Sequence, residues 1–350
     1  MFRAFISALL FSVLTLCCGA QSPQNPTPPV AGDSAVPPEP TPFEAAQALA
    51  AKGRLDQALA KLDALSSQSS EPAGVERLRG IIIYQKDQLQ AAIDAFSKAA
   101  AQDPDDRESI EMQGVSLYRL GRPIEAIPLL EKAHAAVDRT NVDPQYVLGL
   151  CYSDVQRYDD ARHAFALQYD FPPDSAEAYL LAARLFLRRD LAPAAAAQAH
   201  KALEINPNLP LAHQLLGEVA LAKGDSAGAI VELETERKIN PLNGVLYDRL
   251  GDAYLRREQY AEAQQALNRA VLLEPSATAP YILLGQTFLK LKNPIQALHY
   301  LDHAAKMDPS NYVTHNLLAQ AYKATGQVEA ANREFEMVVD LQQKQQTAGK

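Results

Sequence analysis

The chain has 350 residues, of which 47% are hydrophobic and 21% are charged, a composition typical of a folded protein rather than of a disordered one. Its formal net charge of −9 argues against nucleic acid as a partner, because binding to a phosphate backbone depends on basic side chains. Alanine, leucine, glutamate, glutamine, lysine and arginine dominate most of the chain, and these residues favour helices. The composition therefore predicts an all-α fold.

The N-terminal segment has the pattern of a secretory signal peptide. One positive residue, Arg3, precedes an apolar run from Ala4 to Leu16, and small residues follow up to Ala20. The run is shorter than the roughly 20 apolar residues that a transmembrane helix needs, so we expect no such helix in the mature form. We expect residues 1–20 to be cleaved after Ala20 and the protein to be exported, either to the periplasm or into the medium.

An alternative for the N-terminus is a lipid anchor at Cys17 or Cys18, which would make the protein a membrane-anchored lipoprotein. Leu16 argues against it, because lipoprotein signals place a small residue before the modified cysteine. After cleavage at Ala20 only Cys151 would remain, so no intrachain disulfide is expected.

Residues 21–42 form a proline-rich segment. They contain eight prolines and few apolar side chains, a composition that cannot bury a core and favours extended conformations. The sequence therefore predicts a disordered linker between the signal peptide and the folded part.

A period of 34 residues runs through the rest of the chain. Blocks begin near residues 39, 73, 107, 142, 176, 210, 244, 278 and 312, with one inserted residue, Asn141. Such a period is typical of stacked repeats that form one elongated body. We expect a solenoid over residues 43–345 and a short tail over residues 346–350, and the sequence leaves open whether the first repeat is fully formed.

Three places in each block are restricted in size. The eighth place holds glycine or alanine, and the twenty-fourth place mostly holds a large apolar residue, which would fill the space that the small one leaves. The twentieth place is alanine in all nine blocks. These alanines are Ala58, Ala92, Ala126, Ala161, Ala195, Ala229, Ala263, Ala297 and Ala331.

The pattern of apolar residues in each block predicts two amphipathic helices of about 12 to 15 residues, joined by a short turn. Gly121, Gly224 and Gly326 mark turns in which a left-handed residue ends the first helix. Prolines end the second helix in most blocks. They are Pro104, Pro173, Pro207, Pro241, Pro275 and Pro309.

The segment LGDAYLRREQYAEAQQALNRAVLLEP, residues 250–275, resembles the tetratricopeptide repeat in the order of its Leu-Gly, Tyr, Ala, large apolar, Ala and Pro positions. With the signal peptide, the chain resembles an exported bacterial member of that family. The resemblance implies a right-handed superhelix of helix-turn-helix repeats. It also implies that the first helices of successive blocks line a groove that binds a peptide or a partner protein.

Candidate catalytic and metal-binding residues are few, and most have a structural interpretation. His213 and His315 stand at the fourth place of their blocks, where other blocks have tyrosine, so we interpret them as packing residues. His299 and His303 are spaced to bind a metal, but no third ligand is near them in the sequence. Cys151 lies inside an expected helix as a buried thiol. We expect no enzyme activity, no metal and no cofactor.

Helical spacing predicts which side chains face the groove. An apolar and aromatic group comes first, two arginines follow, and acidic and then amide side chains come last. These residues are Ile81, Tyr84, Val115, Tyr118, Tyr146, Leu150, Arg184, Arg188, Glu218, Asp248, Asp252, Gln286, Asn316 and Gln320. A complementary peptide would carry apolar anchors, then an acidic residue and then a basic one.

We interpret the chain as a non-enzymatic scaffold of the cell envelope that binds a peptide or a partner protein in this groove. An alternative is a self-assembling structural component of an envelope or secretion complex, because Phe335, Met337 and Val338 keep the last expected helix apolar. A remote alternative is metal binding through His299 and His303.

Overall fold

The computed structural model describes residues 40–67, 71–134 and 144–348. Within these ranges the chain forms eighteen helices, and they divide into two compact units between Tyr169 and Asp170. The all-α prediction is confirmed. None of the helices in the described ranges is long and apolar enough to cross a membrane.

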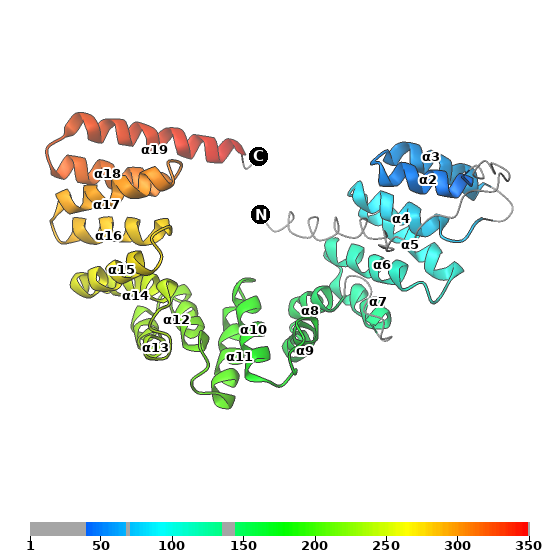
Figure 1. Ribbon diagram of the computed structural model, residues 1–350, viewed down its shortest axis with the longest axis horizontal. Helices are drawn as coiled ribbons and strands as arrows, with labels where there is room; N and C mark the ends of the chain where they lie inside the picture. Colours follow the sequence, from blue (N-terminus) through cyan, green and yellow to red (C-terminus); the bar gives the residue numbers. More distant parts are fainter. Residues whose placement is uncertain (1–39, 68–70, 135–143, 349–350) are drawn as a thin grey trace, which may run out of the picture. The chain divides into compact units, whose positions relative to one another are not determined.

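The first unit contains four helix pairs. They are α2 (Pro42–Ala51) with α3 (Leu55–Ser66), α4 (Val75–Gln85) with α5 (Leu89–Gln102), α6 (Arg107–Arg119) with α7 (Pro123–His134), and α8 (Gln145–Asp154) with α9 (Tyr158–Gln168). The helices of each pair pack against each other (Figure 1).

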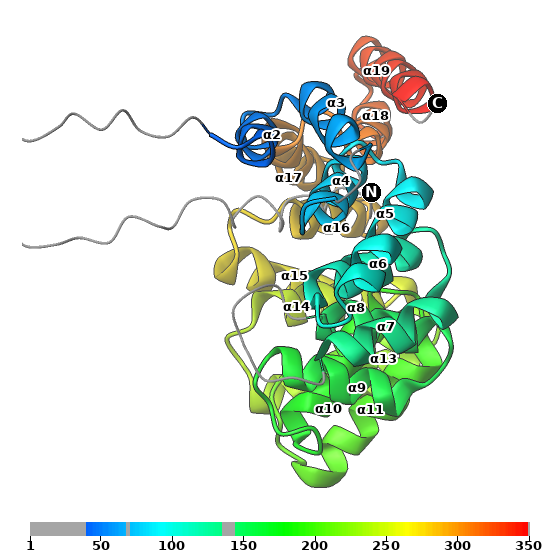
Figure 2. The ribbon, with the colours of Figure 1, turned by 90° about the vertical axis from the view of Figure 1, so that its right-hand side faces the viewer.

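The second unit contains five helix pairs. They are α10 (Ala176–Leu187) with α11 (Ala192–Ile205), α12 (Ala212–Ala222) with α13 (Ser226–Ile239), α14 (Gly244–Arg256) with α15 (Tyr260–Leu273), α16 (Thr278–Lys290) with α17 (Pro294–Met307), and α18 (Tyr312–Ala324) with α19 (Val328–Ala348). Figures 1 and 2 both show α10 beside α11, and the same pairing repeats to α19. Each predicted block therefore corresponds to one helix pair, and α19 continues to Ala348.

The twentieth-place alanines lie at the centre of these pairs. Eight of them are completely buried, and the ninth, Ala331, is 3% exposed. A larger side chain would have to displace the partner helix, since protein interiors are close-packed.

The contact between the eighth and twenty-fourth places confirms the predicted relation between small and large side chains. A Cβ atom added to Gly80 would lie 2.6 Å from the Phe96 ring, and one added to Gly217 would lie 2.6 Å from Leu233 Cγ. Both distances are too short for carbon atoms. In the fifth repeat the eighth place is alanine and the twenty-fourth place, Ala199, is small and fully buried. In repeats with glycine at the eighth place, the two helices can approach closely because only the residue at the twenty-fourth place has a side chain. In the fifth repeat both facing side chains are small.

The turn between the two helices has the same conformation in every repeat. The fifteenth place has a positive φ in all nine repeats, between 58° and 79°. Four of these residues are glycine, as predicted at Gly121, Gly224 and Gly326, and five carry a side chain. The latter are Asp87, Gln156, Asp190, Glu258 and Lys292. Residues with a Cβ atom are strained in this left-handed region, so the fold imposes the turn on them.

Five second helices, α5, α11, α13, α15 and α17, end two residues before a predicted proline, whereas α9 already ends at Gln168, before Pro173. The residue before Pro207 is Asn206, which has φ −133° and ψ 94°, and Asp103, before Pro104, has nearly the same angles. A proline excludes the helical conformation from the residue before it, which explains this extended C-cap.

Successive repeats are connected by tyrosine hydroxyl groups. Tyr254 donates a hydrogen bond of 2.9 Å to Glu234 of the preceding repeat, and Tyr152 donates in the same way to Glu131. Burial, together with the neighbouring Glu234 carboxylate, raises the pKa of Tyr254 to about 12. The hydroxyl therefore remains a donor at neutral pH and holds the two repeats together.

We expect Gly217→Ala to lower the free energy of unfolding by about 1–3 kcal/mol, because the new methyl group overlaps Leu233. Urea unfolding followed by circular dichroism measures this loss. In a Leu233→Ala background the overlap is absent, so the same glycine substitution should no longer destabilise the protein. An equal loss in both backgrounds would contradict the packing explanation.

We expect Lys292→Gly to raise the free energy of unfolding by about 1 kcal/mol, because glycine removes the cost of a left-handed Cβ residue at φ 58°. Lys290→Gly is the matched control. It lies two residues earlier in the last turn of α16, where glycine should cost up to about 1 kcal/mol. Thermal unfolding of both variants measures the change in stability. If both substitutions destabilise the protein, the backbone of Lys292 is not strained.

Candidate functional site

The first helices of successive repeats lie close together within each unit. In the first unit α2, α4, α6 and α8 contact one another in order, and in the second unit α10, α12, α14, α16 and α18 do the same. The second helices of successive repeats do not approach one another as closely in the ranges that the structure describes. Within each unit, the first helices therefore form the concave side. We call the side chains at the fifth, ninth, twelfth and thirteenth places of these helices the inner face.

The apolar residues predicted in the first unit divide into packed and surface side chains. Tyr84, Val115 and Leu150 are buried, with 4–7% of their surface exposed. Ile81 and Tyr146 are half-buried on the inner face.

Tyr84 contributes to packing between repeats. The guanidinium of Arg119 lies 4.8 Å from the centre of the Tyr84 ring, and Arg119 donates a hydrogen bond of 2.6 Å to Asp87. The ring is therefore held between neighbouring repeats and offers little surface to a partner. Tyr118 is half-buried on the next first helix.

Arg184, in the last turn of α10, and Arg188, the C-cap residue of that helix, are both exposed and lie four residues apart. In the part of the chain that the structure describes, neither guanidinium forms an ion pair or a hydrogen bond within the chain. Their exposure and their spacing place both charges on the inner face.

The three predicted acidic residues all have basic neighbours within the second unit. Arg249 lies 3.1 Å from Asp248 and 3.8 Å from Glu218, and Arg256 lies 2.9 Å from Asp252. The sequence prediction did not include these pairs, because neither arginine was assigned to the groove. These carboxylates are partly neutralised by arginines of the same chain. The geometry therefore gives little support to the expectation that a partner peptide carries a basic residue opposite them.

Asp248 differs from the other acidic residues in its burial. Its residue surface is 8% exposed, and its Oδ1 atom has no hydrogen-bond partner among the described residues. Burial raises the pKa of this carboxyl, Arg249 opposes the shift, and Asp252 and Glu274 add to it. Asp248 therefore contributes more to the electrostatics of the fold than to a binding surface.

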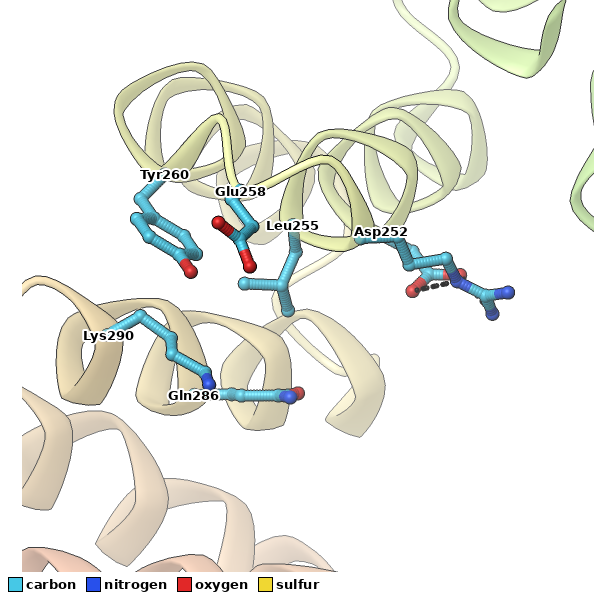
Figure 3. Close-up of a pocket in the computed structure, with 7 residues that line it drawn as sticks. Asp252, Leu255, Glu258, Tyr260, Gln286 and Lys290 are labelled. Atoms are coloured by element: carbon cyan, nitrogen blue, oxygen red, sulfur yellow. Dashed lines mark hydrogen bonds and ion pairs between the residues drawn. The ribbon is translucent and has the colours of Figure 1, made fainter. Parts of the chain in front are cut away.

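A pocket of about 350 Å³ lies between α14 and α16 on the inner face. It is lined by Asp252, Leu255, Arg256, Glu258, Tyr260, Gln286 and Lys290. Figure 3 shows Lys290 extending along the pocket toward Gln286, with Glu258 and Tyr260 on the opposite side. The sequence prediction included Gln286 but missed Lys290, although the thirteenth place could have indicated it.

The remaining predicted amides lie on α18. Asn316 and Gln320 are exposed, and Gln320 donates a hydrogen bond of 3.4 Å to Asn316. These side chains can donate and accept hydrogen bonds but carry no charge.

The histidines are structural, as predicted for His213 and His315. His213 Nδ1 lies 2.7 Å from Glu232, and His315 Nδ1 lies 2.6 Å from Glu334. His315 Nε2 also lies 3.0 Å from the carbonyl oxygen of Pro309. Tyr247 and Tyr281 donate the equivalent hydrogen bond to the carbonyl oxygens of Pro241 and Pro275, which explains the tyrosine or histidine at the fourth place of the last three repeats.

The other candidates for chemistry also lie in structural surroundings. The His303 ring lies 4.4 Å from the Tyr281 ring, and the His299 ring lies 5.2 Å from the Tyr300 ring. In the described ranges, no group of three or more His, Cys, Asp or Glu side chains is arranged to hold a metal ion. Cys151 is completely buried, as expected for a packing thiol.

Three predictions concern residues outside the described ranges. They are the signal peptide at residues 1–20 with its alternative anchors Cys17 and Cys18, the linker up to residue 39, and the inserted Asn141. In the last described helix, Phe335 and Met337 are 40% and 43% exposed.

Comparisons with known families agree with this fold. A sequence model described as "Tetratricopeptide repeat" matches residues 43–107, 146–210 and 249–312, which is more than half of the chain. A second model with that description matches residues 288–349. The model "Anaphase-promoting complex, cyclosome, subunit 3" matches residues 85–167. No curated protein sequence matches the chain.

Three solved structures illustrate the structural similarity. MamA 41-end from Desulfovibrio magneticus RS-1 is 22% identical and has a TM-score of 0.46, with 49% of this chain and 97% of that chain covered. Pseudomonas aeruginosa pilF is 22% identical with a TM-score of 0.44, and the match covers 47% and 75%. The APC/C hetero-tetramer Cut9-Hcn1 is 17% identical with a TM-score of 0.48, and the match covers 87% and 61%.

We expect Asp248→Asn to stabilise the protein at neutral pH. The pKa of this carboxyl is raised in the folded state, so folding becomes less favourable as the pH rises through that pKa and the buried group ionises. Asparagine removes the charge, and the gain should disappear below about pH 4, where the carboxyl is protonated in both states. Thermal unfolding between pH 3 and pH 7 measures this.

Asp105→Asn at an exposed position serves as the control and should change little at any pH. A variant at Asp248 that is less stable than the natural protein at pH 7 would show that the pair with Arg249 outweighs the cost of burial.

Proposed function

Because the chain belongs to the tetratricopeptide repeat family, whose members typically act as non-enzymatic protein–protein interaction scaffolds, we propose that it binds an extended segment of a partner protein along its inner face. We also propose that this binding takes place outside the cytoplasm, in the cell envelope. No catalytic step is part of the proposal.

One observation carries the binding proposal. The inner face presents Arg184 and Arg188 as exposed side chains that form no ion pair or hydrogen bond in the described part of the chain. Packing between helices in the same repeats uses other residues, such as Ala183 and Ala195, which are completely buried. The two arginines are therefore available to a partner at no cost to the fold.

The N-terminal sequence supports the proposed location. Arg3, the apolar run from Ala4 to Leu16 and the small residues up to Ala20 have the order of a secretory signal peptide. The proline-rich residues 21–42 would then separate the repeats from the site of export or anchoring.

We expect an inner-face variant to lose its partner while remaining folded. It combines Arg184→Ala, Arg188→Ala, Asn316→Ala and Gln320→Ala. All four positions are exposed; three lie inside helices, where alanine is favourable, and Arg188 is the C-cap residue of α10. Affinity capture from the native cells, followed by quantitative mass spectrometry, compares this variant with the natural protein. Proteins that are captured specifically by the natural chain should fall by at least about tenfold.

The matched control changes the same number of cations and amides on the second helices. It combines Lys238→Ala, Arg269→Ala, Gln265→Ala and Gln296→Ala, which are also exposed. It should retain the captured proteins. If the natural chain and the inner-face variant capture the same proteins in equal amounts, these inner-face residues do not form the binding site.

We expect the mature protein to begin at Gln21. Intact-mass measurement of protein purified from the envelope fraction should give the mass of residues 21–350 without an added lipid. A mass that includes residues 1–20 would contradict export by cleavage. A mass that begins at Cys17 or Cys18 and includes acyl chains would favour the lipoprotein alternative.

A further inference from the structure

We propose that the inner face of the second unit binds an acidic segment of its partner, that is, an extended stretch rich in glutamate or aspartate. This rests on the proposed scaffold function and specifies the chemistry of the partner. The inner face offers a partner those charges that are not already paired within the chain.

The available charges at the inner-face places of this unit are positive. All four cations are exposed. Arg184, Lys290 and Lys323 lie on α10, α16 and α18, and Arg188 is the C-cap residue of α10. In the described part of the chain none of them forms an ion pair. Four cations are therefore distributed along the face of one compact unit.

The carboxylates at the same places are already engaged. Glu218 and Asp248 share Arg249, and Asp252 is paired with Arg256. Glu218 also accepts a hydrogen bond of 2.8 Å from Gln214. At these places the cations that form no ion pair outnumber such carboxylates, although Glu177 is also exposed on α10 and the whole chain has a net charge of −9. Such a local charge attracts a complementary segment and repels a like one.

The pocket between α14 and α16 provides a place for one acidic side chain. Lys290 and Gln286 supply donors on one side, and the buried Leu255 lies in its lining. Figure 3 shows both donor side chains in the same opening. Glu258 and Asp252 also line the pocket and oppose an acid there, so the charge selectivity of the face depends chiefly on Arg184 and Arg188.

The test uses two labelled peptides of equal length, deca-glutamate and deca-lysine, with the full mature chain. Fluorescence anisotropy at 50 mM and about 150 mM salt should show binding of deca-glutamate and no binding of deca-lysine, and the affinity should fall with salt. Arg184→Gln combined with Arg188→Gln should weaken deca-glutamate binding by about tenfold, which corresponds to two exposed ionic contacts.

The control is Lys238→Gln combined with Arg269→Gln, which removes the same charge from exposed positions on α13 and α15. It should leave the affinity within about twofold. Equal weakening by both double variants would show a general charge effect and overturn the proposal. Tighter binding of deca-lysine, or of a single-stranded deoxynucleotide of ten bases, would also overturn it.

The acidic-partner proposal and the scaffold proposal can fail separately. If deca-glutamate does not bind but the inner-face variant still loses its captured partners, the scaffold function stands and the acidic segment is refuted. If deca-glutamate binds through Arg184 and Arg188 but capture is unaffected, the face has the proposed charge preference and the scaffold proposal fails.

Discussion

The close contact between the two helices of each repeat is the constraint on which the rest of the structure depends. It requires a small residue such as Gly217 opposite a large one such as Leu233, and a completely buried alanine at the twentieth place. Once this contact fixes the helix pair, the short connection imposes the left-handed turn. The proline that follows α5, α11, α13, α15 and α17 accounts for the extended C-cap of these helices. Five residues with a side chain accept a strained φ at the turn, which shows that packing outweighs their local preference.

The same constraint determines where binding chemistry can be found. Residues that hold the pair together recur in every repeat, so they cannot distinguish one partner from another. Side chains on the inner face vary from isoleucine and tyrosine in the first unit to charged and amide groups in the second. Among these variable side chains, those paired with Arg249 or Arg256 stabilise the fold. The charged side chains without such a pair remain available to a partner.

The repeat spacing was sufficient to predict the helix pairs, the buried alanines and the proline-terminated helices, because each depends on local sequence and on a contact that recurs. The left-handed residues at Gln156 and Lys292 could not be predicted in this way, since their side chains do not favour that conformation. The burial of Tyr84 and Asp248 was also missed. Helical spacing gives the direction of a side chain, whereas burial depends on the neighbouring repeat, as the Arg119 contact with Tyr84 illustrates.

The central claim is that the first helices bind the partner and the second helices support them. Hydrogen–deuterium exchange of the native complex, compared with the free protein, tests this most directly. Slower exchange should concentrate in peptides from α10, α12, α14, α16 and α18, with little change in α11, α13, α15 and α17. Protection confined to the second helices would contradict the account and place the partner on the opposite side of the repeats.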